Sequence, residues 1–357
     1  MVENKNIFIE GREIGEGCPV FIIAEIGVNH NGKAALAHDM IDIVADSGCD
    51  CVKFQTFTAN EFCNNPNDTY EYISQGETVK ESMLEMFRRL EFNYDEFNEL
   101  FIHARERNLI PLSTPTDKKA IDLLNNLDCH AYKIGSDDLI YSPFLSLVAS
   151  NKKPIIISTG MAETDDIDRA LKVIEDAGNE DIVILHCISQ YPTPVENINL
   201  NRMIMLRKRY PNIIIGYSDH SWGITSAIGA VALGAKVLEK HFTLDNDMPG
   251  PDHRFSANPE QLSVLVSEVR TIEKSLGSNK IVLTSEDKEM ASLCHRSIYA
   301  ARNLSVGDVL VEDDLVYQRP GIGLMPYENK SIIGRKLNKN ILKGELLSFC
   351  QLENLNE

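Results

Sequence analysis

The sequence has 357 residues, of which 43% are hydrophobic and 25% charged, and its formal net charge is −18. This length suits one large domain followed by a small one. The negative charge disfavours nucleic acid or an anionic membrane as a partner, because like charges repel. The N-terminus does not resemble a signal peptide, and no apolar run approaches the ~18 residues that a membrane span needs. We therefore expect a cytoplasmic globular protein with neither kind of partner.

Short apolar segments alternate with longer amphipathic ones along the first three quarters of the chain. Near-continuous apolar runs such as Ile182–Cys187 are typical of strands buried on both faces of a parallel sheet. Eight strands are predicted, at Val20–Ile26, Cys51–Gln55, Ile110–Ser113, Ala131–Ile134, Pro154–Ser158, Ile182–Cys187, Ile213–Ser218 and Val237–His241.

A helix is predicted after each strand. The segments are Ala34–Ser47, Tyr94–Arg107, Lys118–Asn125, Pro143–Ser150, Asp165–Asp176, Asn201–Tyr210, Thr225–Leu233 and Pro259–Leu276. An eightfold alternation of strand and helix indicates a (β/α)8 (TIM) barrel, with an open doubly wound sheet as the alternative. Residues 58–90 are too long for a simple loop and are either a lid or a tolerated surface insertion.

The barrel pattern ends near residue 277. We predict a barrel domain over 1–277, a linker over 278–290 and a small β-rich domain over 291–357. Two segments of the small domain, Asn303–Leu310 and Asn340–Leu347, share the pattern N-[LI]-x-x-G-[DE]-x-L and indicate a pseudo-symmetric β fold. The eight cysteines are scattered and contain no C-x-x-C pair, so we expect free thiols rather than disulfides.

Polar residues gather at the carboxyl ends of the predicted strands, where a (β/α)8 barrel carries its catalytic groups. Lys53 and Lys133 lie at positions that are normally apolar, so each needs a partner, and we expect an anionic ligand. Lysines together with serine and threonine hydroxyls can hold a phosphate and a carboxylate. The residues at these ends include Glu25, Gln55, Thr114, Ser136, Ser158, Ser189, Tyr191, Ser218, His220, Glu239 and His241.

A metal site is predicted between the last two strands. His220 and His241 follow successive strands and can bind one divalent ion, which leaves positions open for water or substrate. In a closed barrel the first strand neighbours the eighth. Glu25 is therefore placed beside His241 as a base or charge stabiliser.

These motifs resemble the sialic acid synthase family, the bacterial N-acylneuraminate synthases. The resemblance rests on FIIAEIGVNHNG, DCVKFQTF, LSTP, YKIGS, ISTGM, HCISQYPTP, GYSDH and EKHFTLD. The tail segments HRSIYAARNLSVGDVL, YQRPGIG and IIGRKL resemble the antifreeze-like (SAF) domain of that family. The match runs along nearly the whole chain in the same order.

The resemblance implies an enzyme that joins phosphoenolpyruvate to the open-chain aldehyde of an N-acetylated amino sugar and releases phosphate. Glu25, His220 and His241 would be catalytic, and the two histidines would bind Mn²⁺ or another divalent ion such as Mg²⁺ or Co²⁺. Arg319 would reach the sugar in the partner subunit of a domain-swapped homodimer. Phosphoenolpyruvate would be held by Lys53, Thr114, Lys133, Ser136, Ser158 and Ser218, and the sugar by Gln55, Asp138, Ser189, Tyr191 and Arg319.

Two departures from the family pattern leave the acceptor open. Ser189 stands where neuraminate-forming bacterial members often have Asn, and Asp138 where they have Glu. The leading hypothesis is an N-acetylneuraminate synthase that uses N-acetylmannosamine. The alternative is a legionaminic acid synthase that uses 2,4-diacetamido-2,4,6-trideoxymannose, or a related nonulosonate synthase. Two other classes are a metallohydrolase, active without phosphoenolpyruvate, and a non-catalytic binding protein.

Overall fold

The computed structural model describes residues 6–63 and 65–353. The chain divides into two compact units, with the boundary between Gly277 and Ser278. Each unit is described by itself. In the described part of the chain, no helix has both the length and the apolar character that a membrane span requires.

The core of the first unit is an eight-stranded parallel sheet in the order β7-β4-β3-β12-β11-β10-β9-β8. The two end strands, β7 and β8, also contact each other, so the sheet curves into a nearly closed barrel. This confirms the predicted (β/α)8 fold over the open sheet. The strands are β3 (Phe21–Gly27), β4 (Cys51–Thr56), β7 (Ile110–Pro115), β8 (Tyr132–Ile134), β9 (Ile155–Ser158), β10 (Ile182–Cys187), β11 (Ile214–Asp219) and β12 (Val237–His241).

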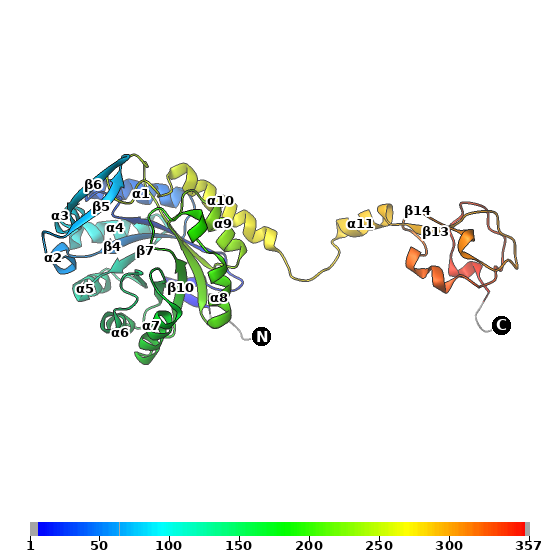
Figure 1. Ribbon diagram of the computed structural model, residues 1–357, viewed down its shortest axis with the longest axis horizontal. Helices are drawn as coiled ribbons and strands as arrows, with labels where there is room; N and C mark the ends of the chain where they lie inside the picture. The colour runs from blue at the N-terminus through cyan, green and yellow to red at the C-terminus, as the bar shows by residue number, and fades with distance from the viewer. Residues whose placement is uncertain (1–5, 64, 354–357) are drawn as a thin grey trace. The chain divides into compact units, whose positions relative to one another are not determined.

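Helices surround the barrel, one after each strand (Figure 1). In α7, for example, Ile167, Ala170, Leu171 and Ile174 are buried, and this i, i+3, i+4, i+7 spacing forms a single apolar face. The barrel helices are α1 (Ala34–Asp46), α4 (Tyr94–Glu106), α5 (Lys118–Asn126), α6 (Ser142–Ala149), α7 (Thr164–Asp176), α8 (Asn201–Arg209), α9 (Thr225–Ala232) and α10 (Pro259–Leu276). A short hairpin, β1 (Ile7–Ile9) and β2 (Arg12–Ile14), precedes the barrel and packs its isoleucines into the same core.

The insertion between β4 and α4 has a structure of its own. It comprises α2 (Ala59–Phe62), an antiparallel hairpin of β5 (Thr69–Ser74) and β6 (Glu77–Ser82), and α3 (Met83–Leu90). Gln75 and Gly76 both have positive φ and make the two-residue turn of the hairpin. These elements gather at one end of the barrel (Figure 1).

The second unit has its own small apolar core. Its helix α11 (Ser285–Cys294) begins inside the predicted linker, so the segment without helix or strand covers only residues 277–284. The helix starts there because Thr284 and Asp287 cap each other's backbone amides, at 3.0 and 3.1 Å. Strands β13 (Ser297–Ala300) and β14 (Leu315–Gln318) then pair antiparallel.

The predicted internal symmetry of the second unit is confirmed. The side-chain oxygen of Asn303 accepts from the backbone N of Lys343 at 2.8 Å, and that of Asn340 accepts from the backbone N of Val306 at 2.8 Å. In each case the first residue of one repeat binds the fourth residue of the other. All eight cysteines are free, as expected.

Candidate active site

A cavity of about 540 Å³ lies at the carboxyl ends of the barrel strands, and every one of the eight strands contributes to its wall. Most of the predicted site residues line it together. They are Glu25, Lys53, Gln55, Thr114, Lys133, Ser136, Ser158, Ser189, Tyr191, Ser218, His220 and His241. Parallel strands bring these residues to one place because all their carboxyl ends face the same way.

Lys53 is the centre of a buried charge cluster. Its Nζ lies 2.7 Å from Glu25 Oε2, 3.6 Å from Glu239 Oε2 and 3.1 Å from Thr114 Oγ1. Burial lowers the pKa of Lys53, but the two carboxylates outweigh it and the net pKa is raised. The protein itself thus supplies counter-charges for Lys53, so burial of this lysine does not by itself require an anionic ligand, and its contact with phosphoenolpyruvate stays a prediction.

Lys133 is placed differently. Its Nζ donates to Ser158 Oγ at 2.7 Å and to the backbone oxygen of Ile134 at 2.9 Å. No carboxylate of the described residues lies within ion-pair distance of it, and burial lowers its pKa. This lysine is thus the cavity's cation with capacity left for an anionic ligand.

The pKa values of the two buried glutamates shift in opposite directions. Burial raises the pKa of Glu25 to about 7, although Lys53 opposes the change. Burial alone would also raise the pKa of Glu239, but the charges of Lys133 and Lys53 outweigh burial, so the pKa of Glu239 is lowered. Ser218 Oγ donates to Glu239 Oε1 at 2.8 Å. Glu25 is therefore the group that exchanges a proton near neutral pH.

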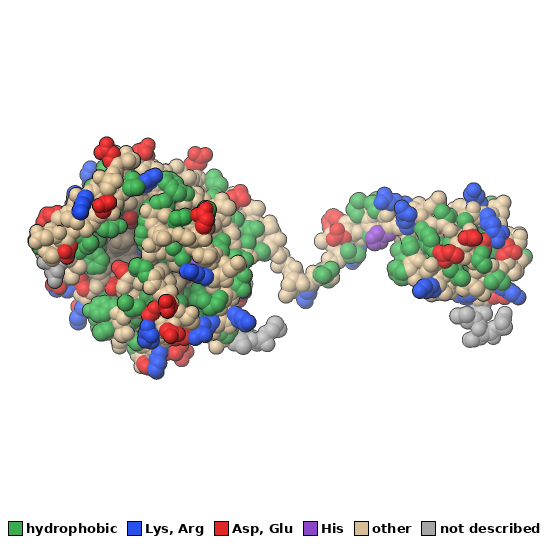
Figure 2. All heavy atoms as spheres, in the orientation of Figure 1, with side chains coloured by type: hydrophobic (Ala, Val, Ile, Leu, Met, Phe, Trp, Pro, Cys, Tyr) green, Lys and Arg blue, Asp and Glu red, His purple; other side chains and the backbone are tan. Residues whose placement is uncertain are grey.

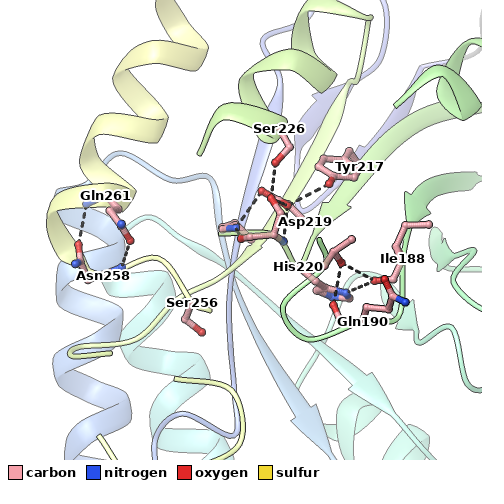
Figure 3. Close-up of polar contacts among 12 residues, drawn as sticks. Ile188, Gln190, Tyr217, Asp219, His220, Ser226, Ser256, Asn258 and Gln261 are labelled. Atoms are coloured by element: carbon pink, nitrogen blue, oxygen red, sulfur yellow. Dashed lines mark hydrogen bonds and ion pairs between the residues drawn. The ribbon is translucent and has the colours of Figure 1, made fainter. Parts of the chain in front are cut away.

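His220 and His241 lie side by side, with ring centroids 5.2 Å apart. The Nδ1 of His220 lies 2.9 Å from the backbone oxygen of Ile188 (Figure 3), which fixes the ring orientation and leaves Nε2 unengaged by that contact. His241 Nδ1 is buried and has no hydrogen-bond partner among the described residues. Burial, together with the positive charge nearby, holds the pKa of His241 well below its usual value, so the ring is neutral.

These two imidazoles fit a divalent ion. A neutral, buried nitrogen with a free lone pair is the state that metal binding requires. Asp252 Oδ2 lies 3.7 Å from His241 Nδ1, but the described residues hold no group of three or more metal-binding side chains. Two protein ligands would leave the remaining positions to water and substrate.

A buried ion pair lies behind the two histidines. Lys240 Nζ is 3.0 Å from Asp219 Oδ2, and both side chains are almost completely buried. Each precedes one of the histidines, so the alternation of the strands turns the ion pair away from the cavity. Asp219 also accepts from Tyr217 and from the backbone N of Ser221, at 3.1 and 2.9 Å (Figure 3).

The positions of the Ser136 and Ser189 hydroxyls in the cavity require a glycine at residue 160. The backbone N of Gly160 donates to Ser136 Oγ at 2.9 Å. A Cβ at residue 160 would lie 2.7 Å from that oxygen and 2.2 Å from Ser189 Oγ, so no larger residue fits without moving both serines.

Only some of the residues predicted to contact the sugar line the cavity. Gln55 Nε2 donates to Glu25 Oε1 at 3.1 Å, and the Tyr191 ring lies 4.4 Å from that of His220. Asp138 is not part of the cavity wall, whereas its neighbour Asp137 is. The two follow β8 in a turn, and only one of two consecutive turn residues faces the cavity. Arg319 is an exposed residue of the second unit, directly after β14.

Sequence reasoning missed several residues of the site. Cys187 ends β10 and lines the cavity, so its position in the strand pattern was the available signal. The sequence places Glu239 at a strand end without a role, and the structure pairs it with Lys53. Phe62 and Tyr70 come from the insertion and reach the cavity through a fold that the sequence did not predict. They favour a lid role for the insertion.

Known protein families and related sequences match this chain along most of its length. The NeuB family model matches residues 40–281, and the SAF domain model matches residues 295–353. An uncharacterized protein of Methanocaldococcus jannaschii is 40% identical over 98% of this chain and 99% of its own length. The N,N'-diacetyllegionaminic acid synthase of Campylobacter jejuni is 38% identical over 91% of this chain and 98% of its own.

A solved structure, the N-acetylneuraminic acid synthetase of Leptospira borgpetersenii in complex with citrate, superposes with a TM-score of 0.73 and 32% identity. It covers 80% of this chain and 95% of that one. The predicted family resemblance is confirmed. The chain belongs to the NeuB family, the nonulosonic acid synthases, and carries a SAF domain at its C-terminal end.

Proposed function

We propose that the protein condenses phosphoenolpyruvate with the open-chain aldehyde of an N-acetylated amino sugar. The observation that carries this proposal is the composition of the cavity, in which Lys133 has no ion-pair partner among the described residues and lies with serine hydroxyls and two neighbouring histidines. The phosphate and carboxylate of phosphoenolpyruvate need such an arc of cation and hydroxyl donors. Lys53, Thr114, Ser136, Ser158 and Ser218 complete it.

The reaction can be balanced with the groups present. The C2=C3 π electrons of phosphoenolpyruvate form the bond between C3 and the aldehyde carbon, and the aldehyde π electrons move to its oxygen. Water adds at C2, and C2 becomes a carbonyl as its bond to the phosphate oxygen breaks. One proton of the water ends on the new hydroxyl and the other on the released phosphate. Glu25, whose pKa burial raises to about 7, is the residue that takes the first of these protons.

His220 and His241 would hold Mn²⁺ or another divalent ion such as Mg²⁺ or Co²⁺. When bound, such an ion supplies Lewis-acid polarisation of the aldehyde oxygen. The chain's own contribution is to keep the His241 ring neutral through burial and to orient the His220 ring through the carbonyl of Ile188.

Two acceptors are compatible with this function. N-Acetylmannosamine is the acceptor of our leading sequence hypothesis. The second is 2,4-diacetamido-2,4,6-trideoxymannose, supported by the relative named N,N'-diacetyllegionaminic acid synthase. We also propose a homodimer in which Arg319 serves the partner's site. Three consecutive residues of the connecting segment, Ile281, Val282 and Leu283, are strongly exposed, and Figure 2 shows hydrophobic side chains there that a second copy would cover.

Phosphate release tests the function. Enzyme, phosphoenolpyruvate and Mn²⁺ are incubated with each acceptor, and phosphate and product mass are measured together. We expect a product whose mass is that of acceptor plus phosphoenolpyruvate plus water minus phosphoric acid. Absence of phosphate release with every acceptor contradicts the proposal, and hydrolytic activity without phosphoenolpyruvate would favour the metallohydrolase alternative.

A further inference from the structure

A second pocket, of about 330 Å³, opens beside the catalytic cavity. We call it the insertion pocket, because six of its thirteen lining residues belong to residues 58–90. The elements of this segment are labelled in Figure 1. The two cavities are adjacent, since both are lined by Gln55, Phe62, Tyr70, Asp137, Tyr191 and His241.

The far wall of the insertion pocket is apolar. Met86 and Leu90 are each only 3% exposed, and the rings of Phe62 and Phe87 pack edge to face at 4.8 Å. Val28 and Met83 complete this wall. A methyl group placed here gains contacts on several sides, whereas a hydroxyl would lose its water without finding a partner on that wall.

The charged groups of the pocket have one sign. Asp137 and Asp252 line it, and no Lys or Arg of the described residues does. A phosphate on the acceptor would therefore meet two carboxylates and no cation. The charges of the pocket's own lining disfavour a phosphorylated sugar and favour a neutral one.

The position of the pocket decides which part of the acceptor enters it. The aldehyde carbon has to lie beside phosphoenolpyruvate, close to His220 and His241, in the catalytic cavity. Gln55, Tyr191 and His241 form the boundary that the two cavities share. An acceptor with C1 at the reacting centre and its chain passing that boundary directs its distal carbons into the insertion pocket.

We propose that the insertion pocket binds the C4–C6 end of the acceptor and selects a sugar with a methyl at C6. The acceptor is then 2,4-diacetamido-2,4,6-trideoxymannose rather than N-acetylmannosamine. This inference rests on the proposed condensation and adds the specificity determinant to it. The residues that discriminate are those of the apolar wall, Met83, Met86 and Phe87.

The test compares kcat/KM at saturating phosphoenolpyruvate for three acceptors: the trideoxy sugar, N-acetylmannosamine and N-acetylmannosamine 6-phosphate. One methyl in an apolar pocket is worth roughly 10- to 200-fold, so we expect at least about 10-fold preference for the trideoxy sugar. We expect no measurable turnover of the phosphorylated sugar.

Met83→Gln places an amide on the apolar wall at nearly constant length. Met83 is half-buried, so the variant should fold. We expect the preference for the trideoxy sugar to fall about 10-fold while the KM for phosphoenolpyruvate is unchanged. Ile73→Gln is the matched control. Ile73 lies on the same insertion, is exposed and is not part of either lining, so its variant should keep the wild-type preference.

The outcomes separate the two proposals. If none of the sugars is turned over, the condensation itself is contradicted. If turnover occurs but N-acetylmannosamine or its 6-phosphate is used as well as the trideoxy sugar, the role of the pocket is overturned while the function stands. The same holds if Met83→Gln leaves the preference unchanged.

Discussion

At the scale of single residues, the decisive group is Glu25. Its carboxylate lies between Lys53 and Gln55, at 2.7 and 3.1 Å, in a fully buried position. Burial would favour the neutral acid and the lysine favours the anion, and the balance puts the pKa at about 7. A general base is most effective when its pKa lies near the working pH.

The ionisation of Glu25 predicts a pH dependence. A carboxyl with a raised pKa is protonated below about 7 and becomes a base above it. We therefore expect kcat/KM for phosphoenolpyruvate to increase as pH rises through about 7. Glu25→Gln should remove this limb and lower kcat roughly 10²- to 10⁴-fold. Initial rates from pH 5.5 to 8.5 measure both effects. A wild-type profile that is flat across this range contradicts the assignment.

Asp137 and Asp138 show where residue-level prediction from sequence ends. Both are carboxylates in one turn after β8, but only Asp137 lines the cavity. The half-buried Asp138 instead has its pKa raised to about 6, by burial and by the neighbouring carboxylate. The backbone angles of a turn decide which of two adjacent residues faces inward. The hydrophobic periodicity of the sequence does not determine these angles.

At the scale of elements, the strands could be predicted because buried parallel strands leave unbroken apolar runs. The polar residues at the ends of these strands then predicted most of the side chains that line the cavity. The partnership of Lys53 with Glu239 could not be read in this way, because it depends on β3 lying between β4 and β12 in the closed barrel. The hairpin of β5 and β6 also escaped prediction, since its side chains are mostly exposed and lack an apolar alternation.

The ion pair of Asp219 and Lys240 joins the ends of β11 and β12, directly before the two histidines. Lys240→Met removes the cation and leaves Asp219 charged in a buried position. We expect the free energy of unfolding to fall by about 3–5 kcal/mol, as for other broken buried pairs. Denaturant unfolding at pH 7.5 measures the loss.

The double variant Asp219→Asn with Lys240→Met is the control for this ion pair. It leaves no uncompensated charge and should recover most of the lost stability. The exposed pair of Lys172 and Asp176 on α7 provides a matched comparison, and Lys172→Met there should cost far less stability than Lys240→Met. Equal losses for Lys240→Met and Lys172→Met would show that burial is not what gives the pair its importance.

At the scale of the whole molecule, the chain consists of a unit that holds the reacting groups and a unit that holds Arg319. The catalytic cavity is complete in its strand-borne residues without the second unit. An exposed arginine in a separate unit is a donor available to a neutral sugar carrying acetamido oxygens, provided that unit is brought to a barrel. Whether the barrel belongs to the same chain or to a second copy is a question that activity can decide.

Two impaired variants can be combined to answer it. His241→Ala removes a proposed metal ligand from the barrel, and Arg319→Ala should raise the KM for the sugar while leaving the molecule's oligomeric state unchanged. If Arg319 serves the partner's site, a hybrid dimer of the two variants contains one site with both native groups. Random mixing makes about half of the dimers hybrids, so activity at low sugar concentration should recover to about a quarter of the wild-type value. If Arg319 serves its own barrel, neither site of the hybrid is complete, and the mixture will be no more active than the separate variants.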